Sequence, residues 1–336
     1  MNVLSVGYPL LPVGPDASGG AEQILSLLDR GLARLGHRSI VVAAKGSVVS
    51  GELIGSPAAN GEMTPEVRSA AQRHHLRLIE SVLDRRSIDL IHFHGLDFHA
   101  YVPNRAVRKL ATLHLPPDWY PPKIFQNQDV QLVCVSQAQA SRAPAASTLR
   151  VIPNGIDLGQ FSPHSDARTH LLWLGRICPE KGVHLALEVA HRLNLPMIVA
   201  GPVHPFRDHQ IYFNEKVRPL LDSQRQHVGA VGLFAKQQLL TEAICLLIPS
   251  LVEETSSLVA MEAIGSGTPV VAFRRGALPE VIESGVTGFL VDSQEEMANA
   301  VARAREISPE VCRERARARF DASRMVAEYL KLYESK

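Results

Sequence analysis

Short runs of β-branched and aliphatic residues alternate with longer segments of helical period along the whole chain, and this alternation limits the possible folds most. It is typical of parallel α/β units. In the first half we expect strands at Val3–Gly7, Ser39–Ala43, Leu90–His94, Ala111–Leu115 and Leu132–Ser136, and helices at Ala21–Leu35 and Pro65–Asp84. In the second half we expect strands at His170–Leu174, Met197–Ala200, Val228–Val231, Leu246–Pro249, Val270–Phe273 and Gly288–Val291. Two such series predict an α/β protein of two Rossmann-like, doubly wound domains.

The chain is also too long for one ordinary core, with 336 residues of which 46% are hydrophobic. A Pro/Asn/Gly turn in the segment STLRVIPNGIDLGQFSP, residues 147–163, marks the expected junction. We therefore predict an N-terminal domain at 1–155, a second domain at 156–318 and a C-terminal helix at 319–336. Ligands of doubly wound sheets bind at the carboxyl ends of the strands, so two such domains facing each other would form a binding cleft.

Composition narrows the class of protein. The net charge is +1, so no basic surface suggests a nucleic-acid partner. The four cysteines are far apart and form no CxxC pair, which favours buried, reduced thiols. The N-terminal segment lacks the features of a signal peptide and no apolar run is long enough to span a bilayer, so we predict a soluble cytoplasmic protein. The basic segment RAVRKL, residues 105–110, leaves peripheral membrane contact open.

Glycine-containing loops follow several expected strands. The loop GPDASGGAE places Gly19 and Gly20 at the start of a helix, where free backbone amides suit an anion. It lacks the GxGxxG spacing, and glycine pairs before helices are often plain turns. Gly201, in the segment AGPVHPFRD, is expected to line the cleft; the nearby His204 and His209 show no defensible metal-ligand spacing.

Two cations follow the strand His170–Leu174. In the segment GRICPEKG, Arg176 and Lys181 are suited to a diphosphate, the guanidinium binding two oxygens and the ammonium acting as a point charge. Surface pairs with Glu180 or Glu188 are an equally good interpretation. No DxD motif is present in the chain, so no tightly bound metal is required.

Three histidines stand at expected strand ends in the first half. His92 and His94 alternate in the segment DLIHFHGLD, and we expect their side chains to point to opposite faces of the sheet, one of them toward the cleft. His114 occupies a similar position one strand later. A single histidine at such a place is usually structural, but three together favour a functional site.

The segment PSLVEETSSLVAMEAIGSGTPVV places Glu254 and Glu262 eight positions apart around the buried start of a helix. A carboxylate in such a place loses hydration and needs a hydrogen-bonding partner. That partner need not be a protein group. The alternative is a helix N-terminal charge for Glu254 and a salt-bridged helix residue for Glu262.

Taken in order, these motifs resemble glycosyltransferase family 4, the retaining sugar-nucleotide enzymes of GT-B fold also called glycosyl transferases group 1. The resemblance covers essentially the whole chain and includes GGAE, the HxH strand end, VIPNGID, GRxxxEKG, the Glu-x7-Glu segment and GTPVVAFRRGALPEVIESGVTGFLV. It implies a hexosyltransferase that moves a sugar from a nucleotide-diphosphate donor, UDP- or GDP-linked above all, to an acceptor hydroxyl, without a required cofactor. It also implies that the last helix packs back on the N-terminal domain, although a dimer surface remains an alternative. The protein is then a monomer or a homodimer.

The resemblance assigns roles to matching residues. Arg176 and Lys181 would neutralise the diphosphate, Glu254 would bind the transferred sugar, and Glu262 would accept hydrogen bonds from the ribose. The resemblance thus implies that a polyhydroxylated ligand satisfies both carboxylates, and that neither is neutralised by a protein cation. His94 would lie nearest the reacting carbon, with His92 and His114 on the acceptor side. The donor-binding set is completed by Gly19, Gly20, Gly201, Val231, Thr255, Ser256, Ser257 and Leu258.

The chain departs from the family pattern at two places. Family members commonly have Pro-Phe-Gly after the first glutamate, whereas Thr255, Ser256 and Ser257 follow here, which puts the identity of the donor sugar in doubt. Ala277 stands where a second glycine is common. Two other functions remain: a nucleotide-sugar 2-epimerase of the same two-domain shape, and a non-catalytic nucleotide-sugar-binding protein.

Overall fold

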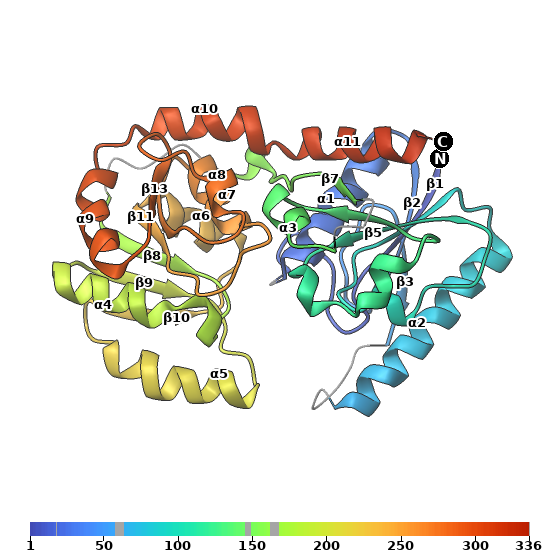
Figure 1. Cartoon of the computed structure of the whole chain (residues 1–336), viewed down its shortest axis with the longest axis horizontal. Coiled ribbons are helices and arrows are strands. Elements are labelled where there is room, and N and C mark those ends of the chain that lie inside the picture. Colours follow the sequence, from blue (N-terminus) through green and yellow to red (C-terminus); the bar gives the residue numbers. More distant parts are fainter. Residues whose placement is uncertain (18, 58–63, 145–148, 162–167, 336) are drawn as a thin grey trace. The chain divides into compact units, whose positions relative to one another are not determined.

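The chain forms two compact α/β units in a computed structural model, which describes residues 1–17, 19–57, 64–144, 149–161 and 168–335 (Figure 1). Unit 1 consists of Met1–Asn154 and Ala322–Lys336, and unit 2 consists of Gly155–Asp321. The predicted α/β class with two Rossmann-like domains is confirmed.

Unit 1 contains one parallel sheet with the strand order β3-β2-β1-β4-β5-β6-β7. Its strands are β1 Asn2–Val6, β2 Arg38–Ala44, β3 Glu52–Ser56, β4 Leu90–Phe93, β5 Arg108–Leu113, β6 Gln131–Cys134 and β7 Leu149–Val151. Its helices are α1 Gly20–Arg34, α2 Pro65–Arg85, α3 Gln137–Ser141 and α11 Ala322–Glu334. Every residue of β4 is buried, as expected for a parallel sheet that is covered on both faces.

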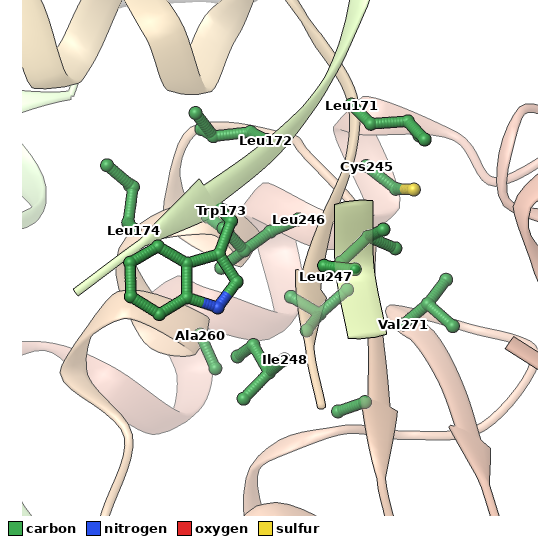
Figure 2. Close-up of a cluster of buried hydrophobic side chains, with 14 of the residues drawn as sticks. Leu171, Leu172, Trp173, Leu174, Cys245, Leu246, Leu247, Ile248, Ala260 and Val271 are labelled. Carbon is green, nitrogen blue, oxygen red and sulfur yellow. The ribbon is translucent and has the colours of Figure 1, made fainter. Parts of the chain in front are cut away.

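Unit 2 repeats this arrangement with the order β10-β9-β8-β11-β12-β13. Its strands are β8 His170–Leu174, β9 Met197–Ala200, β10 Arg225–Gly229, β11 Ala243–Ile248, β12 Val270–Phe273 and β13 Gly288–Val291. Its helices are α4 Val183–Leu193, α5 Arg207–Tyr212, α6 Leu233–Thr241, α7 Leu258–Gly265, α8 Leu278–Val281, α9 Gln294–Ala304 and α10 Pro309–Phe320. The core contains Leu171–Leu174 of β8 and Cys245–Ile248 of β11, together with Ala260 and Val271 (Figure 2).

The last helix, α11, belongs to unit 1 and packs against α1. A Cβ atom on Gly31 would lie 2.6 Å from a methyl carbon of Val326, so only glycine permits this close helix approach. The Arg108 guanidinium donates hydrogen bonds to the carbonyl oxygens of Leu332 and Tyr333, at 2.7 and 2.8 Å. These bonds satisfy carbonyl groups that the last helical turn leaves without partners.

The sequence-based prediction missed two strands and placed the start of three others too late. The missed strands are β3, which has a polar and glycine-containing sequence, and β7, which is only three residues long. The strand β10 begins at Arg225 and has exposed positions, whereas the prediction began at the apolar Val228. The predictions for β5 and β11 likewise began three residues late. Backbone pairing with a neighbouring strand decides these bounds, and hydrophobic pattern alone does not reveal it.

Candidate functional site

The strand order of unit 2 reverses between β8 and β11. From β8 the chain crosses to β9 on one side, and after β10 it returns to β11 on the other. Loops that leave the carboxyl ends of two such neighbours diverge, and ligands of doubly wound sheets bind where they do. The loop after β8 contains Arg176 and Lys181, and the loop after β11 contains Glu254.

Lys181 and Glu254 meet at this point. The ammonium nitrogen of Lys181 lies 2.6 Å from Glu254 Oε1, and the side chains are 27% and 10% exposed. The Ser250 hydroxyl donates a hydrogen bond to the same oxygen. The backbone amide of Leu251 donates to the Glu180 carbonyl at 2.8 Å, which ties the two loops together.

Glycines allow the backbone to pass close to this ion pair. Gly182 has a φ of +63° and Gly276 a φ of +54°. A Cβ on Gly182 would collide with the Pro249 carbonyl oxygen, and a Cβ on Gly276 would collide with backbone atoms of Glu254. Ala277 donates its amide hydrogen to the Glu254 carbonyl at 2.7 Å. The segment Gly276–Ala277 therefore packs directly against the backbone of Glu254.

A second buried ion pair joins Glu262 of α7 to Lys236 of α6. The ammonium nitrogen lies 2.6 Å from Glu262 Oε1, and the side chains of Lys236 and Glu262 are 16% and 7% exposed. Burial raises the pKa of Glu262, while the charge and hydrogen bond of Lys236 lower it. Lys236 thus offsets part of the cost of holding a carboxylate in this place.

The expectation that neither carboxylate is neutralised by a protein cation is wrong. Lys181 pairs with Glu254, and Lys236 pairs with Glu262. Both carboxylates are largely buried, and an ionised group in such a place requires a countercharge or hydrogen bonds whether or not a ligand is bound. Lys181 forms no surface pair with Glu180 or Glu188 either, since its partner among the described residues is Glu254.

Arg176 is exposed and forms no ion pair with any residue in the described ranges. Gly201, at the end of β9, has a φ of +149°, and a Cβ there would collide with the Gly175 carbonyl oxygen. Gly201 therefore lets the loops after β8 and β9 approach each other. Val231 is partly buried and packs against the core of unit 2.

The residues after Glu254 lead into the first turn of α7. The helix begins at Leu258, and its N-cap residue Ser257 makes no side-chain capping bond. The Ser256 hydroxyl is buried and has no hydrogen-bond partner in the described part of the chain. Thr255 lies beside it in the same loop. The start of α7 thus presents backbone amides that a ligand oxygen can satisfy.

In unit 1 the strand order reverses between β1 and β4. Helix α1, which follows β1 along the chain, begins at Gly20, and its N-cap Gly19 also provides no side-chain cap. A Cβ on Gly19 would collide with a carboxylate oxygen of Glu22. At these two glycines no side chain covers the backbone at the start of α1, near the carboxyl end of β1.

His92 in β4, His94 directly after it and His114 directly after β5 form a hydrogen-bonded row. His94 Nδ1 lies 3.2 Å from His114 Nε2, and His94 Nε2 lies 3.2 Å from His92 Nδ1. His92 also contacts the Tyr333 hydroxyl at 2.6 Å and the Thr112 hydroxyl at 2.8 Å. Burial lowers the pKa of His92 to about 3 and that of His114 to about 4, and the pKa of His94 well below its usual value. The row is neutral at physiological pH.

The expectation that His92 and His94 point to opposite faces is wrong. Their rings are only 4.0 Å apart between centroids. Residues two apart along an extended chain lie on the same face of a sheet, because successive side chains alternate. The two histidines therefore belong to one cluster.

Two family profiles match the chain, one in each half. The profile described as "Glycosyltransferase Family 4" matches residues 18–160, and the profile described as "Glycosyl transferases group 1" matches residues 168–306. The chain belongs to the group 1 glycosyltransferases. Family membership agrees with the resemblance inferred from the motifs.

Individual glycosyltransferases share less than a third of their residues with this chain over the matched parts. The chain is 26% identical over 230 residues to lipopolysaccharide 1,2-N-acetylglucosaminetransferase of Salmonella typhimurium, covering 60% of this chain and 58% of that protein. It spans 40% of a D-inositol 3-phosphate glycosyltransferase of Corynebacterium efficiens, to which it is 29% identical. The matches therefore span about half the length of these relatives.

Solved structures establish the GT-B fold. The sucrose-phosphate synthase of Thermosynechococcus elongatus superposes with a TM-score of 0.82 over 99% of this chain and 98% of that chain, at 20% identity. An Anabaena protein determined in complex with UDP and glucose superposes with a TM-score of 0.77 over the full length of both chains, at 18% identity. At these identities the likeness concerns the fold alone.

Sequence reasoning about this glycosyltransferase missed Lys236, Ser250 and Tyr333. Lys236 is the one charged residue in the helical segment LFAKQQLLT, which is a weak signal of a buried partner. Tyr333 appeared only as one of several apolar residues at helical spacing, and nothing in that pattern pairs it with His92.

No helix in the described ranges is long and apolar enough to cross a bilayer.

Proposed function

We propose that this protein transfers a hexose from a nucleoside-diphosphate sugar to an acceptor hydroxyl with retention of anomeric configuration. The single observation that carries the proposal is the Lys181–Glu254 pair at the carboxyl ends of β8 and β11. It places a cation suited to a diphosphate beside a carboxylate suited to sugar hydroxyls, in the unit of a group 1 glycosyltransferase that follows residue 154.

Lys181 and Arg176 bind the diphosphate in this proposal. Both lie in the loop after β8, and the exposed Arg176 has no competing ion pair among the described residues. Negative charge grows on the diphosphate as the glycosidic bond breaks, so fixed cations stabilise the transition state more than the ground state. Glu254 holds Lys181 in place before the donor arrives.

Glu262 and Lys236 bind the nucleoside. An ionised Glu262 accepts hydrogen bonds from the ribose hydroxyls through the lone pairs that Lys236 leaves free. Thr255, Ser256, Ser257 and Leu258 contribute the start of α7, and the unpaired hydroxyl of Ser256 is suited to a donor oxygen. Gly201 and Val231 shape the neighbouring loops.

His94 contacts the acceptor in this proposal, and its hydrogen-bonded neighbours His92 and His114 also lie on the acceptor side. A neutral imidazole can donate or accept a hydrogen bond without placing a charge near the sugar. Gly19 and Gly20 provide backbone amides at the start of α1 in the same unit. No resident cofactor or metal is part of this proposal.

The transfer step balances without a protein nucleophile. The acceptor oxygen forms a bond to the anomeric carbon on the face from which the diphosphate leaves. The bond between that carbon and the phosphate oxygen breaks, and its electron pair stays on the oxygen. The acceptor proton passes to the departing diphosphate, while the protein supplies positioning and charge.

UDP is the first nucleotide to test, because the Anabaena neighbour was solved with UDP and with UDP-glucose. A thermal-shift screen of UDP-, GDP-, ADP- and TDP-sugars identifies the donor, since a ligand that binds only the folded state raises its stability. The product formed with the best donor and a panel of hydroxyl acceptors is then analysed by NMR. An α-linked product from an α-linked donor supports the proposal, whereas an inverted product, or an isomerised nucleotide sugar made without acceptor, contradicts it.

A further inference from the structure

Cys178, Glu180 and His209 bring three metal-binding atoms together outside the ion pairs described above. The Cys178 sulfur, a Glu180 carboxylate oxygen and a His209 ring nitrogen all lie within 4.8 Å of one another. Cys178 and Glu180 belong to the loop after β8, and His209 belongs to α5, after β9. These strands are parallel neighbours, so their carboxyl ends bring the two loops together.

The surroundings leave these atoms available to a ligand. Cys178 is buried, and its thiol donates a hydrogen bond of 3.4 Å to the Arg176 carbonyl, with the Glu180 carboxylate also within reach. The Nδ1 atom of His209 is buried and has no hydrogen-bond partner in the part of the chain that the structure describes. The His209 ring packs edge-on against Phe206, with 5.2 Å between centroids. A buried ring nitrogen without a hydrogen-bond partner is a group that a bound ion can satisfy.

The geometry points to a zinc site formed by Cys178, Glu180 and His209, and we propose that it binds one Zn²⁺. Thiolate sulfur, imidazole nitrogen and carboxylate oxygen are the ligands that zinc takes in proteins, with bonds of about 2.0–2.3 Å. Tetrahedral coordination requires separations of about 3.3–3.8 Å between ligand atoms, so no pair within 4.8 Å needs to contract by more than about 1.5 Å. Three protein ligands leave a fourth position for water.

The two loops differ in how firmly they are held. The amide of Lys181 donates to the Cys178 carbonyl at 3.2 Å, and the amide of Leu251 donates to the Glu180 carbonyl at 2.8 Å. Cys178 and Glu180 therefore form the fixed side of the site. His209 lies on the short helix α5, and its side chain is the one that moves to close the coordination sphere.

Zinc binding releases the thiol proton to solvent, because the thiolate is the ligand. Burial raises the pKa of Cys178 to about 12, so the thiol is protonated in the free protein at neutral pH. The net charge of the group rises by one when Zn²⁺ binds and the proton leaves. The site uses none of the atoms of Lys181, Glu254 or Glu262, so its existence does not depend on the proposed transferase activity.

The test titrates the full-length protein with Zn²⁺ in competition with a chromophoric chelator, and with Co²⁺ as a spectroscopic probe. Variants Cys178→Ser, Glu180→Gln and His209→Gln each remove one ligand, and Cys312→Ser is the control because Cys312 is another buried thiol of unit 2. We expect one Zn²⁺ per chain, a thiolate-to-cobalt absorption band in the wild type and in Cys312→Ser, and at least about tenfold weaker zinc binding in each ligand variant.

Three results would overturn the site. They are the absence of stoichiometric zinc binding, unchanged affinity in Cys178→Ser or His209→Gln, or a cobalt spectrum without the thiolate band. Loss of the partly exposed Glu180 carboxylate is the mildest change to the fold. The thermal unfolding of the Glu180→Gln variant without metal is compared with that of the wild type, so that weakened zinc binding is not confused with unfolding.

Discussion

Replacing Lys236 with methionine should destabilise unit 2 by leaving Glu262 without its countercharge. Removal of one partner from a buried ion pair costs about 3–5 kcal/mol. Because the side chains of Lys236 and Glu262 keep 16% and 7% of their exposure, we expect the lower end, about 3 kcal/mol. With a urea dependence of about 2 kcal/mol/M, the unfolding midpoint falls by about 1.5 M.

Tryptophan fluorescence can follow this transition in unit 2 selectively. Trp173 is buried in the unit 2 core, and Trp119 of unit 1 is exposed, so a Trp119→Phe background leaves one reporter. The variants compared are Lys236→Met, Glu262→Gln, their combination, and Lys216→Met as an exposed lysine of the same unit. The double variant should be more stable than Lys236→Met alone, because the uncompensated charge is gone.

The same comparison has a defined pH dependence. Burial raises the pKa of Glu262 above its usual 4.5, and loss of Lys236 removes the charge and hydrogen bond that lower it. A carboxyl with a raised folded-state pKa favours folding at low pH, and this contribution is lost as pH rises through the folded-state value. The destabilisation by Lys236→Met should therefore be small near pH 4.5 and full at neutral pH. An equal midpoint in Lys236→Met and wild type at neutral pH would refute the reasoning.

Three further changes test other parts of the structure. Gly276→Ala should weaken donor binding and lower the melting temperature, because its Cβ collides with the Glu254 backbone; Gly285→Ala, with a φ of +81° and open space around the Cβ, is the matched control and should affect stability only. In an NMR titration, His92, His94 and His114 should remain neutral from pH about 5 to 8, since burial lowers each pKa; a midpoint within that range would contradict the buried row. Tyr333→Phe should cost about 1 kcal/mol and change the ¹⁵N shifts of His92, because a 2.6 Å hydrogen bond is lost; unchanged shifts would mean that the bond does not form.

Sequence alone was sufficient for the fold because hydrophobic pattern and topology are closely linked in parallel α/β proteins. Buried strands such as β8 and β12 carry continuous apolar runs, and their bounds were predicted to the residue. Edge strands such as β3 and β10 are partly exposed and carry polar residues, so the same signal fails there.

The site was predictable only in part, because motifs locate residues along the chain but do not show their partners. The loops after β8 and β11 were identified, yet the pairing of Lys181 with Glu254 depends on how those loops fold. The partners of Glu262 and His92 come from distant elements: Lys236 lies 26 positions before Glu262, and Tyr333 lies 241 positions after His92. The cluster of Cys178, Glu180 and His209 was missed because His209 lies on α5, far along the chain from the loop that contains Cys178 and Glu180.

The most direct test of the proposed donor site is calorimetric binding of UDP, and of the diphosphate of whichever donor the screen identifies, to wild type, Lys181→Met and Lys216→Met. A charge-assisted hydrogen bond contributes about 1.5–3 kcal/mol, so we predict that Lys181→Met weakens diphosphate binding by about 10–100-fold while Lys216→Met binds as the wild type does. Equal affinity in Lys181→Met and wild type would contradict the assignment of the Lys181–Glu254 pair as the donor diphosphate site.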